Sequence, residues 1–397
     1  MNQVIQRPPL WARLRPLWRG LDGPLLAACA WLMAWGLLAM YSVGFDHGTR
    51  FVEHARNFAI GITVMLAVAQ VPVAKLSRLT LPLYVAGVIL LLGVEFFGIT
   101  RKGATRWLNI GVTTIQPSEL LKIATPLMLA WWFQLRENAT GSTRMRFADF
   151  VTAFVLLAIP FGLIAKQPDL GTGMLVLFAG LYVCYFAGLS WKLIVPVVAA
   201  GAIGISALIA AEDHICQDEV EWVLLREYQK TRVCTLLDPH KDPLGKGFHV
   251  LQGEIAIGSG GVTGKGFMKG TQTHLEFIPE RTTDFIFAAF AEEFGLAGAL
   301  ALLLGFSALI FRGLTIAGEA ATLFERLLAG AITLSFFSYV FVNLGMVIGL
   351  LPVVGVPLPF VSYGGTAMVM LGLSLGLLLA IGRNSGRNGA RSRGKAR

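Results

Sequence analysis

Ten stretches of mostly apolar residues dominate the sequence, and each is close to the length that a helix needs to cross a bilayer, about 20 residues. Hydrophobic residues make up 55% of the 397 positions and charged residues 14%, against about 25% charged residues in soluble proteins. The sequence therefore predicts an all-α polytopic membrane protein with ten transmembrane helices, and it excludes a disordered chain and a typical soluble enzyme. The predicted spans are 23–43, 57–72, 79–98, 118–135, 148–166, 170–189, 192–211, 284–311, 325–350 and 364–382.

Lysine and arginine are unevenly distributed between these stretches. Four arginines lie within 1–22, and six basic residues follow position 382. Because basic residues stay on the cytoplasmic side, both termini are predicted to be cytoplasmic, which requires an even number of spans. The net charge of +9 then reflects membrane topology, and no nucleic-acid partner is predicted. Arg101, Lys102 and Arg106 fall in an outer loop against this pattern, which marks them as candidate functional residues.

The spans divide the chain into five parts within one integral membrane domain. A basic N-terminus (1–22) precedes spans one to seven (23–211), and a large extracytoplasmic loop (212–283) separates these from spans eight to ten (284–382) and a basic tail (383–397). A loop of this length is usually functional or disordered, and its aromatic and aliphatic content favours order.

The large loop also carries the two cysteines that lie outside the spans. Cys216 and Cys234 are on the side of the membrane where oxidation is permitted, and the residues alone leave their pairing open. The six histidines of the chain match no metal template in their spacing, so no metal ligands are predicted.

Charged residues within the spans need a reason, because charges are costly inside a bilayer. Glu119 and Lys122 lie three residues apart, so they share a helix face and are predicted to pair. Lys166 stands at a helix break together with Asp169. Both places fit either a structural ion pair or turn, or a polar site for an anionic ligand near the outer surface.

Asp284 lies where the large loop returns to the membrane, close in sequence to Glu280 and Arg281. An acidic residue in a first helical turn favours the helix dipole, and Thr282, Thr283 or Asp284 is a candidate N-cap. The same dense group of charges at a membrane surface is also a candidate functional site.

Two further acidic residues follow in the same predicted span. Glu292 and Glu293 lie about 80° and about 180° from Asp284 around an ideal helix. The two carboxylates are therefore predicted to face different surroundings, and at least one must be buried in protein, not in lipid.

The segment 351–366 holds three prolines and three glycines at the outer membrane level, so it is not a continuous helix. Irregular backbone at that depth must pack in protein or line a wet cavity. Ser362, Tyr363 and the neighbouring glycines would offer hydroxyl and backbone donors there, which suits a phosphate or sugar.

These residues together predict a polar cavity that faces outward, with Asp284 as its prominent carboxylate. Its basic groups suit a phosphorylated lipid headgroup. The residues alone leave open whether that lipid is transported or chemically changed. The basic groups are Arg101, Lys102, Arg106, Lys122 and Lys166.

Seven motifs, in order along nearly the whole chain, resemble those of the SEDS family of bacterial cell-wall proteins (shape, elongation, division and sporulation). They include Gln-Pro-Ser-Glu-Leu-Leu-Lys at 116–122 and Pro-Glu-Arg-Thr-Thr-Asp-Phe at 279–285. The Arg at 281 looks like the RodA branch, whereas the FtsW branch typically has Ala there. Thr282 departs from the His that is common in the RodA branch, and this departure leaves Asp284 intact. The other motifs are 105–110, 166–172, 238–243, 247–266 and 357–365.

The resemblance implies a peptidoglycan glycosyltransferase that polymerises lipid II at the periplasmic face of the bacterial cytoplasmic membrane during elongation. It implies a class B penicillin-binding protein (PBP2-type) and the cell-shape machinery as partners. Asp284 matches the family's essential carboxylate, and Glu119 and Lys122 match its polar pair. No organic cofactor is implied, and a Mg²⁺ or Mn²⁺ ion bridging the pyrophosphate stays open. The supporting residues are then Arg106, Lys166, Arg101, Lys102, Arg281, Ser362 and Tyr363.

Three other functions are alternatives. A lipid II flippase would use the same cavity without chemistry, but it needs polar residues through the whole bilayer. A non-catalytic scaffold would use Asp284 as a helix cap only. The division-specific FtsW type would perform the same chemistry in a different machine, and the Arg at 281 argues against it.

Overall fold

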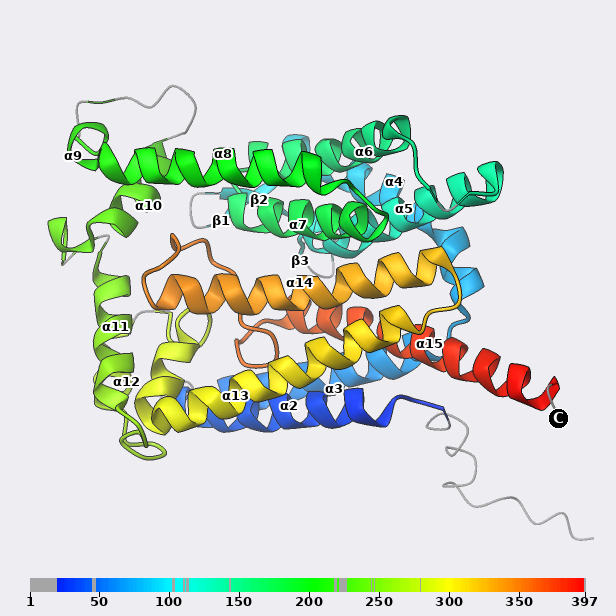
Figure 1. Cartoon of the computed structure of the whole chain (residues 1–397). Coiled ribbons are helices and arrows are strands. Elements are labelled where there is room, and N and C mark those ends of the chain that lie inside the picture. The colour runs from blue at the N-terminus through cyan, green and yellow to red at the C-terminus, as the bar shows by residue number, and fades with distance from the viewer. Residues whose placement is uncertain are drawn as a thin grey trace, which may run out of the picture.

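The computed structural model describes residues 20–44, 48–101, 104–109, 111, 114–142, 144–217, 220, 227–243, 245, 247–278 and 280–395. Ten long helices lie roughly side by side, and a group of short helices crosses one end of the bundle (Figure 1). We call this end the loop end. The long helices are α2 (Gly23–Val43), α3 (Arg50–Ala69), α4 (Val73–Phe97), α5 (Pro117–Thr140), α6 (Phe147–Lys166), α7 (Leu170–Phe186), α8 (Trp191–Ala210), α13 (Ile286–Gly318), α14 (Leu323–Val347) and α15 (Gly365–Lys395).

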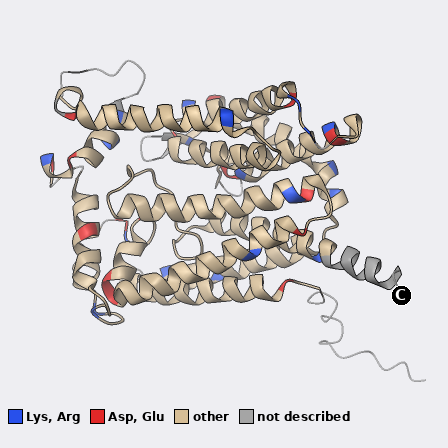
Figure 2. Cartoon of the chain, in the orientation of Figure 1, with Lys and Arg blue, Asp and Glu red and all other residues tan. Residues whose placement is uncertain are grey.

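Eight of these helices are long and apolar enough to cross a membrane; the set leaves out α5 and α7. Helix α7 has only 17 residues, and α5 carries charged residues near both of its ends. Long stretches of ribbon between the two ends of the bundle carry no charge (Figure 2). The chain is therefore a multi-pass membrane protein in which every predicted span corresponds to a helix.

Two helices begin earlier than the sequence predicts. Helix α3 begins at Arg50, not at 57, and α4 begins at Val73, not at 79. In both cases the first turns are polar, with residues such as Glu53 and Lys75, and they extend beyond the apolar run. The apolar run locates the membrane-crossing part of a helix, whereas its polar ends follow from backbone hydrogen bonding.

The prediction of an all-α chain misses a small antiparallel sheet between α4 and α5. It consists of β1 (Ile99–Arg101), β2 (Ala104–Asn109) and β3 (Thr114–Ile115), in the order β1-β2-β3. Ile99 pairs with Trp107, and Leu108 pairs with Ile115. Aromatic and β-branched residues favour strands, and here they lie in a short segment between two helices.

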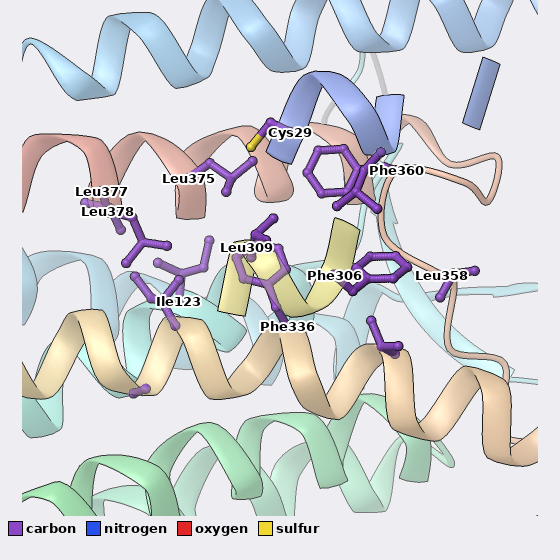
Figure 3. Packing of buried hydrophobic residues seen from close by; sticks show 14 of the residues in the cluster. Cys29, Ile123, Phe306, Leu309, Phe336, Leu358, Phe360, Leu375, Leu377 and Leu378 are labelled. Carbon is purple, nitrogen blue, oxygen red and sulfur yellow. The ribbon is translucent and has the colours of Figure 1, made fainter. Parts of the chain in front are cut away.

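The core fills the space between α2, α5, α13, α14 and α15. Large side chains from helices far apart in sequence meet there, among them Phe306, Phe336 and Leu375 (Figure 3). Leu358 and Phe360 enter the same core from the segment between α14 and α15. That segment is therefore packed in protein, although it is not helical.

The segment between α8 and α13 is ordered where the structure describes it, as its composition predicts. Cys216 and Cys234 form a disulfide with a Cα–Cα distance of 5.6 Å, which settles the pairing that the sequence leaves open. The bond joins the turn after α9 to α10. The short elements of this segment are α9 (Glu212–Ile215), α10 (Glu227–Leu237), η1 (Pro239–Lys241), α11 (Phe248–Gly260) and α12 (Thr271–His274).

The opposite end of the bundle is fastened by buried or half-buried ion pairs. Asp22 caps α2 by accepting from the Leu25 N–H at 3.0 Å, and it also pairs with Arg312 of α13 at 2.6 Å. Arg136 of α5 pairs with Asp149 of α6 at 2.6 Å. These pairs hold neighbouring helices together where the chain leaves the apolar layer.

Helix α13 is broken at Gly295, where φ is +63° and ψ is −162°. The break frees backbone groups, and the glycine-rich stretch at 261–266 pairs with them. The N–H of Leu296 donates to Gly261 at 2.9 Å, and the N–H of Gly266 donates to Glu293 at 3.0 Å. The glycine-rich stretch thus holds the first turns of α13 by backbone hydrogen bonds.

Replacing Gly295 with Ala is expected to lower the free energy of unfolding by about 1–3 kcal/mol, because this backbone conformation is essentially restricted to glycine. Thermal unfolding in detergent measures the effect. Gly201→Ala in α8 is the control, since no atom lies within 4 Å of the added methyl group. Equal stability of the two variants would contradict this account of the break.

Candidate active site

Asp284 lies in the turn that joins the large loop to α13, and its side chain is half-buried. The turn is closed by hydrogen bonds from the N–H groups of Thr283 and Phe285 to the carbonyl of Glu280, at 3.0 and 3.3 Å. Helix α13 begins at Ile286 with Phe285 as N-cap and no side-chain cap. Helix α13 thus begins two residues after the predicted start of the span, and the predicted caps Thr282, Thr283 and Asp284 are wrong, because these residues belong to the turn and not to the helix end.

The segment 351–364, which we call the proline-rich segment, packs directly on this turn. The hydroxyl of Ser362 donates to the carbonyl of Thr283 at 2.6 Å and accepts from the Leu358 N–H at 2.8 Å. The N–H of Tyr363 donates to the carbonyl of Thr282 at 2.9 Å. Ser362 thus holds the Asp284 turn in place, whereas the sequence predicts a hydroxyl that faces a ligand.

Asn343 of α14 is part of this site, although no sequence motif predicts it. It is fully buried, and its amide donates to the carbonyls of Asp284 at 3.0 Å and Val356 at 2.8 Å. A signal was present, because an amide in the apolar run 325–350 is costly unless it has partners. The carboxylate of Asp284 faces the proline-rich segment, since a Cβ on Gly355 would lie 3.5 Å from its Oδ2.

Tyr363 connects the site to α3. Its hydroxyl donates to Glu53 at 2.5 Å, and the guanidinium of Arg50 lies 4.5 Å above its ring. Burial, together with the Glu53 carboxylate, raises the pKa of Tyr363 above its usual value. The sequence predicts Tyr363 as a site residue, but its two charged partners lie in the polar first turn of α3, outside the predicted span.

His249 of α11 packs on the other side of the turn. Its ring centre lies 5.9 Å from that of Phe285, the neighbour of Asp284. Burial lowers the pKa of His249 below the usual value, and the nearby Glu280 carboxylate opposes this shift. No sequence pattern separates this histidine from the other five, because its contact with Phe285 is tertiary.

A cavity lies beside the turn, between α5, α7, α14, α15 and the proline-rich segment, and Asp284 is not among the residues that line it. Glu119 and Lys122 line it and pair at 2.6 Å, which confirms their predicted pairing. Lys122 also lies 5.2 Å from the ring centre of Tyr339. Ser362 lines the same cavity, so one residue contacts both the cavity and the turn of Asp284.

Two other predicted basic residues, Arg106 and Lys166, are paired with carboxylates or carbonyls. Arg106 contacts Asp169 at 3.4 Å and donates to the carbonyl of Pro168 at 2.5 Å. Lys166, which is largely exposed, pairs with Glu95 at 2.5 Å. These two pairs lie at the junctions of α4, the sheet, α6 and α7.

Arg281 is buried. Its guanidinium contacts the carbonyl of Val43 and the carboxylate of Glu276, each at 3.4 Å. Lys102 and the side chain of Arg101 lie outside the described residues.

Glu292 and Glu293 are both buried, and both hold the large loop. Glu292 pairs with Lys265 at 2.7 Å and accepts from the backbone N–H groups of α12. Glu293 accepts from Ser42 of α2 at 2.5 Å and lies 3.6 Å from His274. The prediction that at least one of them is buried in protein is confirmed, and their role is to anchor the loop on α13.

In the part of the chain that the structure describes, no three His, Cys, Asp or Glu side chains come together as metal ligands. A Mg²⁺ or Mn²⁺ ion that bridges the substrate pyrophosphate needs only one or two protein carboxylates, so that ion stays a prediction.

Comparison with known proteins places these features in a family context. The FtsW/RodA/SpoVE family model, described as cell cycle protein, matches residues 23–387. The peptidoglycan glycosyltransferase MrdB of Escherichia coli (strain K12) is 44% identical over 361 residues, which cover 91% of this chain and 93% of that protein.

Solved structures agree. A chain reported as "Structural coordination of polymerization and crosslinking by a peptidoglycan synthase complex" superposes with a TM-score of 0.75 at 28% identity, covering 93% of this chain and 99% of that chain. The rod shape determining protein RodA of Thermus thermophilus superposes with a TM-score of 0.67 at 26% identity, covering 92% and 98%.

The lowered pKa of His249 predicts a pH dependence of stability. An unfolded histidine binds a proton below about pH 6.5, whereas folded His249 resists it, so the folded state loses stability as the pH falls below that value. His249→Gln is expected to remove part of this loss, as measured by melting temperature between pH 7.5 and 5. His240→Gln, at an exposed position in η1, is the control and should follow the wild type. Identical pH profiles for all three proteins would contradict the burial effect.

Proposed function

The chain belongs to the FtsW/RodA/SpoVE family, and on that premise we propose that it is a peptidoglycan glycosyltransferase of the elongation type. It polymerises lipid II into β-1,4-linked glycan strands. The observation that carries the proposal is the position of Asp284, a half-buried carboxylate in a turn that α14 and the proline-rich segment hold through backbone carbonyls. The cavity lined by Ser362 adjoins the same turn.

In the reaction, Asp284 acts as the general base. It takes the proton from the 4-hydroxyl of the GlcNAc of an acceptor lipid II. The oxygen attacks the anomeric carbon of the donor MurNAc, and the bond to undecaprenyl pyrophosphate breaks with inversion from α to β. A positioned base of this kind contributes typically about 10²–10⁴-fold to the rate.

Negative charge develops on the departing pyrophosphate, and hydrogen-bond donors or cations are needed to stabilise it. Arg106, Lys122 and Lys166 are the candidates, and each is already held by a carboxylate at or below 3.4 Å. Such pairs fix the cations in place before the substrate binds. A cation of this kind stabilises the leaving group without a costly rearrangement at the moment of reaction.

The same proposal fixes the orientation of the chain. All ten long helices span the membrane, with both termini in the cytoplasm and the loop end, with Asp284, at the periplasmic face. The domain parts are then 1–22, 23–211, 212–283, 284–382 and 383–397, as the sequence analysis divides them. The uneven distribution of Lys and Arg supports this orientation.

A class B penicillin-binding protein of the PBP2 type, which crosslinks the strands, is the proposed partner, together with other proteins of the cell-shape machinery. The likeness to a chain of a peptidoglycan synthase complex supports this. The lipid II flippase is the second candidate for the same cavity. The contacts of Glu292 and Glu293 with Lys265 and His274 of the large loop argue against the flippase, because they occupy the deeper polar residues that a pathway through the bilayer would use.

Asp284→Asn is expected to lower the rate of glycan polymerisation by at least about 10²-fold while leaving the protein folded, because the amide cannot accept the proton. Purified full-length chain, with its penicillin-binding partner, is incubated with lipid II, and glycan length is read by gel electrophoresis. Glu212→Gln in α9 is the matched acidic control.

Wild-type rates from Asp284→Asn would refute the base assignment. Normal synthesis by Asp284→Ala would indicate that the Asp284 carboxylate takes no part in catalysis and that the chain acts as a scaffold. No polymer from the wild type, with intact transfer of lipid II across liposomes, would indicate the flippase.

A further inference from the structure

Asn343 occupies an unusual position for an amide. It lies in the last turns of α14, its side chain is fully buried, and apolar residues such as Met346 and Val347 follow it on the same helix. Asn343 lies within the predicted span 325–350 but in none of the seven motifs, and it is not among the predicted site residues. A buried amide is retained where its hydrogen bonds are needed, because it is otherwise costly to place there.

Three consecutive carbonyl groups in the Asp284 turn accept hydrogen bonds from elsewhere in the protein. The carbonyl of Thr282 accepts from the Tyr363 N–H, and that of Thr283 accepts from the Ser362 hydroxyl. The carbonyl of Asp284 itself accepts from Asn343 at 3.0 Å. Of these three bonds, only the one from Asn343 ends on Asp284, the residue whose carboxylate is the proposed general base.

The amide nitrogen of Asn343 also donates to Val356 of the proline-rich segment at 2.8 Å. An amide NH₂ group has two hydrogens, so both are used, one on each of the two segments. Its oxygen is buried without a hydrogen-bond partner among the described residues. The NH₂ group therefore holds the Asn343 side chain in place. It also joins the backbone of Asp284 to the proline-rich segment, which the Asp284 carboxylate faces.

We propose that Asn343 is a positioning residue for glycosyl transfer: its amide fixes the backbone of Asp284 relative to the proline-rich segment and so directs the carboxylate. The inference rests on the proposed role of Asp284. Asn343 is buried behind the turn and acts through Asp284, so its loss should affect the chemical step more than substrate binding.

The test compares kcat and KM for lipid II in the full-length chain with its penicillin-binding partner. Asn343→Leu keeps the side-chain volume and removes the donors, and it is expected to lower kcat by about 10- to 100-fold, since a misplacement of about 1 Å costs about that much. KM should stay within about twofold. Thr333→Val is the control, because this buried hydroxyl bonds only within α14 among the described contacts, to Ala329.

A second variant guards against misfolding. Asn343→Gln keeps both donors on a longer side chain, and it is expected to fold with a near-native melting temperature and a lowered kcat. Wild-type kcat from both variants would overturn the proposal, as would a rise in KM at unchanged kcat.

A double variant separates positioning from general stability. If Asn343 acts through Asp284, adding Asn343→Leu to Asp284→Asn should not slow the residual reaction further, because coupled residues are not additive. Multiplied losses would show a structural role and overturn the inference. A fully active Asp284→Asn would refute the proposed base role on which this inference rests, whereas an inactive Asp284→Asn with an unaffected Asn343→Leu would refute this inference alone.

Discussion

The bilayer leaves no water to satisfy the backbone, so every polar group at membrane depth needs a partner within the protein. The break at Gly295 and the proline-rich segment are two places where the backbone is not satisfied within a helix. The stretch 261–266 pairs with the first, and Asn343 and Ser362 pair with the second. These hydrogen bonds shape the loop end, because they tie α13 to the stretch 261–266 and α14 to the proline-rich segment.

The same hydrogen bonds place Asp284. Its turn has no helical cap, and it takes its geometry from α14, the proline-rich segment and α11. These bonds fix the backbone from which the Asp284 carboxylate projects, which suits the general base that we propose. The irregular backbone is therefore the means by which the site is built, not an interruption of the bundle.

The charges around the site follow one rule. Lys122, Arg106 and Lys166 each lie beside a carboxylate, from Glu119, Asp169 and Glu95. Isolated cations would be costly in this layer, and pairing reduces that cost. An anionic headgroup that binds here must share each cation with its carboxylate, which weakens the attraction. Substrates that also make apolar contacts with the largely apolar cavity are therefore favoured.

The sequence by itself determined the helices, the membrane class and the Glu119–Lys122 pair. Through its motifs it also determined the family and pointed to Asp284 as the candidate base. These depend on apolar runs and on residues three apart, which are local. The tertiary structure decided the break at Gly295, the small sheet, the disulfide, and the contacts of Asn343, His249 and Glu53 with the site. Those depend on which helices become neighbours, and no local pattern encodes a hydrogen bond between residues 284 and 343.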